Sequence, residues 1–173
     1  MVFRKATVQD IPAIERIYED IHTEEEAGRT SIGWIRGVYP TRKTAEASLA
    51  RGDLFVAEDA GMVVGTAIIN QQQVDAYKEA DWHYPAKDDE VMVLHTLVIA
   101  PQMAQRGFGK GFVAFYEDYA RQHDCLYLRM DTNVRNLRAR AMYQKLGYAE
   151  IGIVPCVFNG IEGVQLVLLE KKL

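Results

Sequence analysis

The sequence predicts a mixed α/β fold, in which helices cover both faces of a mixed central β-sheet. Residues 91–100 form an almost unbroken apolar run, typical of a strand that is buried on both faces. Residues 108–122 follow with aromatic side chains at helical spacing. Residues 151–169 alternate in polarity around Asn159-Gly160, which predicts a β-hairpin with a type I′ turn. With the elements described next, these stretches give the order β-α-α-β-β-β-α-β-α-β-β.

The remaining elements follow from hydrophobic periodicity and end signals. Thr7 and Asp10 resemble a helix N-cap with an acid in the first turn, so a helix is expected from there to about Glu26. Gly52 is expected to end a second helix at residues 41–51. Further expected elements are a strand at residues 2–6, a hairpin of residues 54–58 and 62–73, a strand at 126–132, and a helix that begins at Asn133 or Asn136 and ends at Gly147.

Length and composition bound the class of protein. With 173 residues, 49% hydrophobic and 25% charged, the chain is expected to form a single globular domain, residues 1–173. No apolar run approaches the ~20 residues that span a bilayer, and the first residues lack a signal-peptide core. Cys125 and Cys156 lie far apart without metal-ligand spacing, so no metal site is expected. A cytoplasmic location is the simplest expectation, and the net charge of −4 argues against a nucleic-acid partner.

Three glycines follow the strand at 91–100 at alternate positions. Pro101 ends the strand, and Gly107, Gly109 and Gly111 open the next helix. A strand, a tight turn and a helix N-terminus aim several backbone N–H groups at one place, which suits a phosphate group. The spacing fits neither the dinucleotide-binding motif nor the P-loop. The alternative is that the glycines only allow the helix to pack closely on the strand.

Two motifs resemble the GNAT superfamily of N-acetyltransferases. The first is its acyl-CoA loop: Pro101, Gly107 and Gly109 match the pattern, whereas Ala104 stands where the family usually has Gln or Arg. Because loop N–H groups hold most of the diphosphate, Ala104 is expected to weaken or alter the ordering of the loop, whereas the site is expected to be retained. The second motif is Asn-x-x-Ala-x-x-x-Tyr-x-Lys/Arg-x-Gly-Phe/Tyr, and it is matched in register by Asn136, Ala139, Tyr143, Lys145, Gly147 and Tyr148.

The resemblance implies acetyl-CoA as the cofactor, and a sheet whose two central strands splay apart so that the acyl carrier enters between them. Backbone N–H groups near Leu97, Val98 and Ile99 would polarise the thioester carbonyl. Asn136 would orient an amide of the cofactor, and Lys145 would offer further charge to the phosphates. The loop and helix start that would hold the diphosphate comprise Gln105, Arg106, Gly107, Phe108, Gly109 and Lys110.

The same resemblance implies that Tyr143 protonates the leaving thiolate, with a contribution of about 10²–10⁴ if its geometry is tight. The alternative is a core aromatic residue. The acceptor amine, with a pKa of ~10, must lose a proton. His95 in the middle of the strand and Glu90 at its mouth are the candidate bases, directly or through a water chain. A lone histidine on an apolar strand is also typical of a hydrogen-bonded core residue.

In this family the segment between the first two helices lies over the acceptor site, so Trp34, Arg36 and Tyr39 are candidate substrate contacts. Alternatively, Trp34 and Tyr39 fill the core beneath a loop. Residues 71–90 form a long polar stretch, expected to be a lid, a partner surface or a dispensable insertion. Acids in this stretch and in residues 15–26 either favour the approach of a cationic amine or form solvated faces.

These expectations converge on an acetyl-CoA-dependent N-acetyltransferase. It would move an acetyl group from the thioester to a primary amine of a small molecule or peptide, by direct attack in a ternary complex. The alternative is an acyl-CoA-binding sensor or interaction module without turnover, and the presence of Tyr143 favours the enzyme. A homodimer is a further expectation, since GNAT-like domains often pair, whereas no membrane and no nucleic acid is expected as a partner.

Overall fold

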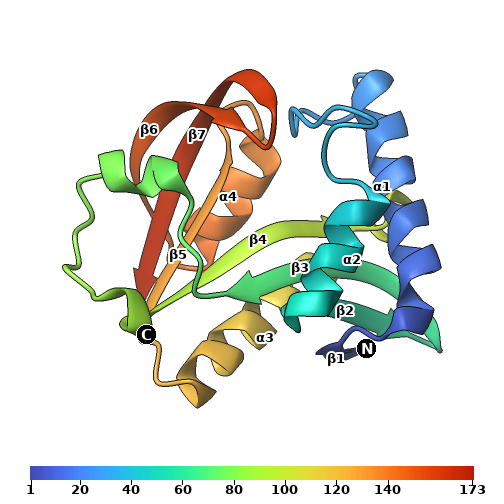
Figure 1. Ribbon diagram of the computed structural model, residues 1–173, viewed down its shortest axis with the longest axis horizontal. Coiled ribbons are helices and arrows are strands. Elements are labelled where there is room, and N and C mark those ends of the chain that lie inside the picture. The colour runs from blue at the N-terminus through green and yellow to red at the C-terminus, as the bar shows by residue number, and fades with distance from the viewer.

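The computed structural model describes residues 1–173, with the exception of the side chain of Glu79. Its helices and strands are arranged as in Figure 1. The α-helices are α1 (Ile11–Glu26), α2 (Arg42–Arg51), α3 (Phe108–Gln122) and α4 (Leu137–Lys145). The strands are β1 (Val2–Lys5), β2 (Leu54–Asp59), β3 (Met62–Asn70), β4 (Val91–Ile99), β5 (Tyr127–Asn133), β6 (Ala149–Phe158) and β7 (Ile161–Lys172). Short 3₁₀ turns are η1 (Val8–Asp10), η2 (Asp75–Glu79), η3 (Asp88–Glu90) and η4 (Pro101–Met103).

Within these residues the strands form a seven-stranded sheet in the order β1-β2-β3-β4-β5-β7-β6. β4 and β5 run parallel, because α3 carries the chain back across the sheet, and the other neighbours run antiparallel. Asn159 and Gly160 have φ of 47° and 83°, the two positive values that a type I′ turn requires. The predicted mixed α/β fold is confirmed. None of the described helices combines the length and the apolar character that crossing a bilayer would require.

The two central strands separate after a short ladder. Pairing between β4 and β5 ends at Leu94 and Met130, whereas β4 continues to Ile99 and β5 to Asn133. Beyond that point the described strands diverge: β5 turns toward α4, and β4 runs toward α1 (Figure 1). The splayed arrangement expected for the central strands is therefore present.

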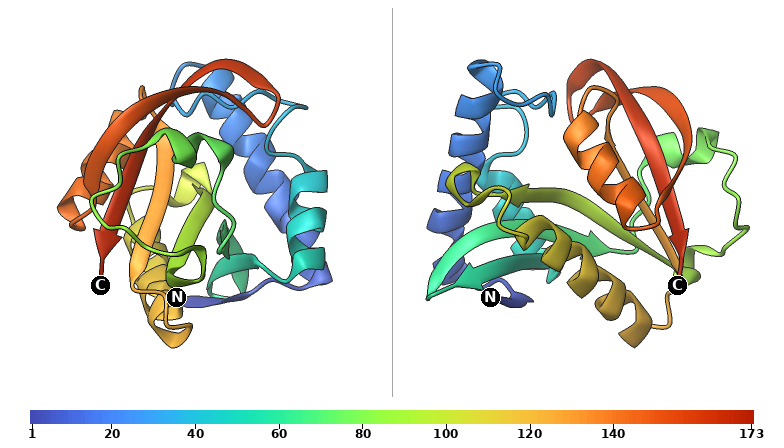
Figure 2. Two further views of the ribbon diagram at one scale, coloured as in Figure 1. Left: turned by 60° about the vertical axis from the view of Figure 1, so that its left-hand side comes forward. Right: turned by 180° about the vertical axis from the view of Figure 1, so that it is seen from behind.

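Helices cover both faces of the sheet because each helix has one apolar side. α1 and α2 lie on one face of β2–β4, and α3 lies on the opposite face (Figures 1 and 2). α4 packs on the same side as α3 through Tyr143. A third core forms between the C-terminal strands and residues 71–90, with Tyr77 fully buried in it. Residues 71–90 are thus an integral layer of the protein.

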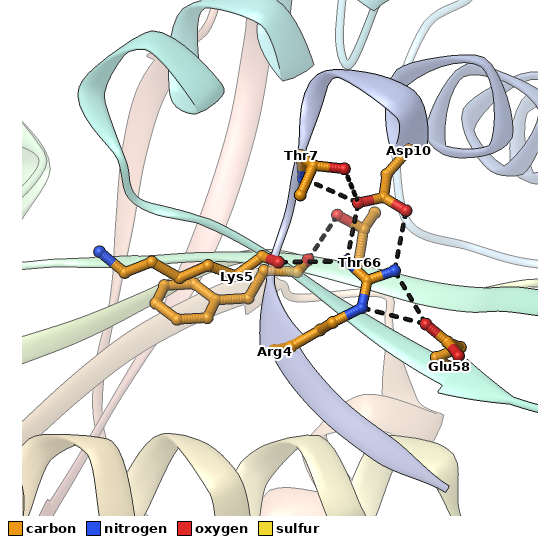
Figure 3. A network of polar contacts seen from close by, with 7 residues as sticks. Arg4, Lys5, Thr7, Asp10, Glu58 and Thr66 are labelled. Carbon is orange, nitrogen blue, oxygen red and sulfur yellow. Dashed lines mark hydrogen bonds and ion pairs between the residues drawn. The ribbon is translucent and has the colours of Figure 1, made fainter. Parts of the chain in front are cut away.

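A network of ion pairs fixes β1 to its neighbours (Figure 3). Arg4 donates two bonds to Asp10 of η1, at 2.8 and 2.9 Å, and two to Glu58 of β2, at 3.0 and 2.8 Å. Asp10 also accepts bonds from the N–H and the hydroxyl of Thr7, at 2.7 and 2.9 Å. The bonds from Arg4, together with those from Thr7, outweigh burial and lower the pKa of the Asp10 carboxyl to about 2.

We expect Asp10→Asn to lower the free energy of unfolding by about 1–2 kcal/mol at pH 7. Because the pKa of folded Asp10 lies below its unfolded value of about 3.9, this stabilisation is present above pH ~4 and is lost as the pH falls toward 2. Urea unfolding of both proteins at pH 7 and pH 3 would show the difference shrinking at the lower pH. A difference of equal size at both values would contradict its ionic origin.

Candidate active site

A cavity of about 630 Å³ opens where β4 and β5 separate. Its walls come from both strands, β3, α2, α4, the segment 27–41 between α1 and α2, the start of residues 71–90, and the β6–β7 hairpin. Segments that are remote in sequence therefore meet at the end of the β4–β5 ladder, which makes this cavity the candidate active site. Polar and aromatic residues that line it include Trp34, Tyr39, His95, Asp131, Asn136 and Tyr143.

A bulge distorts the wall that β4 provides. Where β3 places one residue, β4 places two, Thr96 and Leu97. Thr96 has φ of 50°, which a β-branched residue rarely adopts, and its hydroxyl is hydrogen-bonded to that of Tyr39. Leu97 lines the cavity and also packs against the core under α3. The side chains of Val98 and Ile99 pack into different cores, and neither residue lines the cavity.

The glycine turn before α3 has the geometry of an open helix N-terminus. Gln105 and Gly107 have φ of 64° and 89°, and the Gly107 carbonyl accepts the first helical bond from Gly111 N–H at 2.9 Å. The preceding N–H groups lack a carbonyl partner within the helix. The Phe108 side chain is buried and anchors this end. Gly111 has another role: a Cβ there would lie 2.8 Å from the Phe3 ring, so this glycine allows α3 to pack on β1.

This turn fits a diphosphate group. Arg106 and Lys110 are exposed beside it, and neither forms an ion pair with a described side chain. The Arg106 guanidinium contacts the sulfur of Met103 at 3.2 Å. A Cβ at Gly109 would meet the Met142 sulfur at 3.4 Å, an ordinary contact, so packing alone does not require this glycine. Open N–H groups and two cations supply what a polyanion needs.

Asn136 and Lys145 stand at opposite ends of α4. The Asn136 Oδ1 caps the helix by accepting from Ala139 N–H at 3.2 Å, and its Nδ2 donates to the Thr132 hydroxyl at 3.1 Å. Asn136 lines the cavity, close to the end of β5. Lys145 is exposed and lies outside the cavity lining. Asn136 therefore lies at the cavity wall, and Lys145 lies at the far end of α4, exposed to solvent.

Tyr143 reaches the cavity from α4 and is 6% exposed. Burial raises the pKa of its hydroxyl above the ordinary value, and the charge of Asp131 raises it further. The phenol therefore remains protonated at neutral pH. No described group forms a hydrogen bond with this hydroxyl, so it is available to a ligand in the cavity.

The two bases expected from the sequence differ in position. His95 lines the cavity, but its Nε2 lies 3.0 Å from the Asn70 Oδ1, which also accepts from Gln72 N–H at 2.9 Å. Burial lowers the pKa of His95 to about 4, so this ring is neutral and weakly basic at pH 7. Glu90 lies outside the cavity, where its carboxylate accepts from Lys87 N–H at 2.9 Å. His95 thus has the geometry of a hydrogen-bonded strand residue, and Glu90 that of a turn cap.

Asp131, which sequence analysis did not single out, faces the same cavity from β5. Its carboxylate accepts a hydrogen bond from the Tyr77 hydroxyl at 2.8 Å. Burial raises the pKa of this carboxyl to about 6, so it is largely ionised, yet basic, at neutral pH. Tyr39 and Tyr143 line the same cavity; burial raises the pKa of both hydroxyls, and the Asp131 charge raises it further.

A signal for this residue was present in the sequence. Residues 126–132 were expected to form a buried strand, yet they contain Arg129 and Asp131. A charge inside a buried strand needs a partner or a function. The two residues have separate partners, because Arg129 donates to Gln73 and to the carbonyl of Tyr84.

Of the three candidate acceptor contacts, two line the cavity and one does not. Trp34 and Tyr39 line the cavity and meet edge to face, with ring centroids 5.9 Å apart. Arg36 instead contacts α1: its Nε donates to Glu26 at 2.8 Å, and a second nitrogen pairs with Glu19. Arg36 therefore fastens the segment 27–41 to α1.

The sequence matches the acetyltransferase (GNAT) family over residues 13–148, which is more than half of the chain. The chain belongs to the GNAT family. It is accordingly an acyltransferase, an enzyme of the N-acetyltransferase type. No curated protein matches the sequence.

Solved structures share the GNAT fold of this chain. A GNAT-family acetyltransferase from Streptococcus agalactiae 2603 is 24% identical with a TM-score of 0.83, over 99% of this chain and 95% of that one. The ribosomal-protein-alanine N-acetyltransferase from Brucella melitensis is 20% identical with a TM-score of 0.73, over 100% of both chains. The ribosomal-protein-S18-alanine N-acetyltransferase from Escherichia coli is 16% identical with a TM-score of 0.67, over 99% of this chain and 92% of that one. At these identities the likeness is one of fold.

Proposed function

We propose that this GNAT enzyme transfers the acetyl group of acetyl-CoA to a primary amine by direct attack in a ternary complex. The observation that carries the proposal is the pairing of a basic carboxylate, Asp131, with a protonated phenol, Tyr143, in the cavity beside the open edge of β4. Two titratable groups whose pKa values are displaced in this way are suited to act as base and acid.

Asp131 is the general base in this proposal. An alkyl amine with a pKa of ~10 arrives as an ammonium ion, and the ionised carboxylate attracts it and accepts its proton, directly or through water. A carboxyl pKa of about 6 keeps Asp131 ionised at neutral pH while making it a stronger base than an exposed aspartate. His95 is a poorer candidate, since burial lowers its pKa to about 4.

The neutral amine nitrogen then forms a bond to the acetyl carbon while the carbon–sulfur bond breaks. Backbone N–H groups of the β4 bulge, near Leu97 and Val98, are proposed to stabilise the charge that develops on the carbonyl oxygen. Tyr143 donates its proton to the departing thiolate. The first amine proton thus ends on the carboxyl side, the second passes from the nitrogen to water as the amide forms, and the phenol proton ends on the thiol. Exchange with bulk water restores both groups, with one proton released overall.

The acetyl donor is proposed to lie in the gap between β4 and β5. Its amides would pair with the free β4 edge, Asn136 would contact the pantetheine arm, and the turn of Gln105, Gly107 and Phe108 would face the diphosphate. Arg106 and Lys110 supply positive charge there. Ala104 removes one side chain that the family usually provides, but not the N–H groups.

The acceptor is proposed to enter past Trp34 and Tyr39. A second cavity of about 560 Å³ adjoins the first and shares Gly33, Trp34, Asn133 and Val164 with it. This extra space favours an acceptor longer than a simple amine, such as a peptide with a free N-terminus. Two of the similar structures are named as alanine N-acetyltransferases, so a peptide that begins with alanine belongs in any acceptor screen.

Thermal unfolding with millimolar acetyl-CoA tests donor binding. For a dissociation constant of ~10 μM, the ligand contributes ~2.7 kcal/mol, and the melting temperature should rise by roughly 5–10 °C. NADH and ATP serve as controls and should give no comparable shift. Thiol release is then measured with an alanyl peptide and with small alkyl amines. Absence of any acetyl-CoA shift would contradict the proposed donor, and a shift without thiol release from any amine would contradict turnover.

A further inference from the structure

Residues 71–90 are built into the protein more firmly than a lid would be. Arg129 of β5 donates to Gln73 Oε1 at 2.6 Å and to the Tyr84 carbonyl at 3.2 Å, and its guanidinium lies 4.1 Å from the centre of the Trp82 ring. The His83 N–H donates to the buried Glu170 carboxylate of β7 at 2.6 Å. The start and the middle of the segment are therefore bound to the strands beneath it.

This anchoring delivers one side chain into the interior. Tyr77 of η2 is 3% exposed and packs among the apolar side chains of β4, β6 and β7. Trp82 holds it from outside: the two rings lie 5.3 Å apart, and the indole N–H donates to the Tyr77 carbonyl at 2.9 Å. The Tyr77 hydroxyl, fixed in this way, donates to the Asp131 carboxylate at 2.8 Å.

We propose that Tyr77 is a positioning residue for the reaction: its hydroxyl, delivered by residues 71–90, holds the Asp131 carboxylate at the cavity wall and favours its ionised form. This inference rests on the proposed role of Asp131 as the base. It assigns a function to the long polar stretch, which contributes no other hydrogen bond to that carboxylate among the described residues.

The other groups around Asp131 supply no competing partner. No described lysine, arginine or histidine forms an ion pair with it. Arg129, two residues away on β5, is directed toward Trp82 and Gln73, and Glu170 of β7 is occupied by His83. The titratable groups on the surrounding elements are Tyr39 of segment 27–41, His95 of β4, Tyr143 of α4 and Cys156 of β6. Arg51 of α2 also lines the cavity, but its guanidinium pairs with Asp53 at 2.8 Å.

The direction in which Tyr77 changes the pKa of Asp131 follows from its hydrogen bond. Burial favours the neutral form of Asp131, and the hydrogen bond from Tyr77 favours the charged form. Removal of the hydroxyl leaves the burial unchanged, so the pKa of Asp131 should rise further. A stronger donor at the same position should lower it.

The test is a ¹³C NMR titration of the side-chain carboxyl groups, with the Asp131 signal assigned by its absence in Asp131→Asn. In Tyr77→Phe the Asp131 midpoint should move up by about 0.5–1 pH unit. Tyr84→Phe, in the same segment but without contact to Asp131, is the matched control and should leave the midpoint in place. Incorporation of 3-fluorotyrosine at position 77 keeps the shape and gives a more acidic phenol, so the midpoint should move down.

Activity supplies a second readout. In Tyr77→Phe the acidic limb of the kcat/KM profile should shift upward with the NMR midpoint, and the rate on the plateau should fall because the carboxylate is held less firmly. Two results would overturn the role of Tyr77. One is an unchanged Asp131 midpoint in both Tyr77→Phe and the 3-fluorotyrosine protein. The other is a loss of rate that is uniform at every pH, with the acidic limb of the kcat/KM profile in place. If the midpoints shift but Asp131→Asn remains fully active, Tyr77 still controls the pKa of Asp131, and the proposed role of Asp131 as the base is contradicted.

Discussion

Replacement of Asp131 by asparagine is expected to lower kcat/KM by about 10²–10⁴-fold, the range of a positioned general base. The same change should make the protein more stable at pH 7.5. Burial raises the pKa of folded Asp131 to about 6, above its unfolded value of about 3.9. Its favourable contribution to stability is therefore complete below pH ~4 and is lost as the pH rises through 6. Asparagine removes the buried charge and can still accept the bond from Tyr77.

The gain is expected to be roughly 1–3 kcal/mol at pH 7.5 and close to zero at pH 4. Urea unfolding at the two pH values measures it, and thiol release with a turned-over amine measures the rate. Asp20→Asn is the matched control, because Asp20 is exposed on α1 and does not line the cavity. Loss of both activity and stability would indicate a structural role for Asp131, and retained activity would exclude it as the base.

Tyr143→Phe is expected to slow transfer at least tenfold while the affinity for acetyl-CoA changes by less than twofold. The ring of Tyr143 stays in the core, and the change removes only the hydroxyl that faces the cavity. The raised pKa of this phenol keeps it protonated throughout the usual assay range, so the wild type should show no alkaline loss of rate from Tyr143 below pH ~10.

Tyr148→Phe provides the comparison for this variant. Tyr148 is also buried and lies 6.1 Å from Tyr143, ring to ring, but its hydroxyl donates to Glu117 at 3.0 Å on the side of α3. It should therefore transfer acetyl groups at close to the wild-type rate. Single-turnover thiol release and calorimetric titration with acetyl-CoA separate the two effects. A Tyr143→Phe enzyme with an unaltered rate would remove this residue from the mechanism.

Local signals made much of the fold predictable. The aromatic spacing after Gly107 predicts a helix at 108–122, and α3 has those bounds. The Asn159-Gly160 dipeptide predicts its hairpin because few other residues tolerate two positive φ values. Asn136 is the cap of α4, one of the two starts that the sequence allowed. The expected end of β3 near Gln73 was wrong, since the strand ends at Asn70.

The acid–base pair was less accessible from the sequence because it depends on contacts that are distant along the chain. Tyr143 belongs to a recurrent motif, whereas the surroundings of Asp131 come from Tyr77 of residues 71–90 and from the distant segments that line the cavity. His95 looked more promising because imidazole is the usual base near pH 7, but burial and Asn70 determine its behaviour. Arg36 lies in the expected acceptor segment, yet the acids of α1 draw it away from the cavity.

The short ladder between β4 and β5 has a mechanical consequence. Four residue pairs, ending at Leu94 and Met130, join a half-sheet of β1–β4 to a half-sheet of β5–β7. The backbone edge near Leu97 belongs to the first half, and Asp131 and Tyr143 belong to the second. We expect flexing at this short ladder to change the distance between the two sets of groups. A donor bound between the half-sheets, as proposed above, would restrict that motion, so we expect the acceptor to bind productively only after the donor.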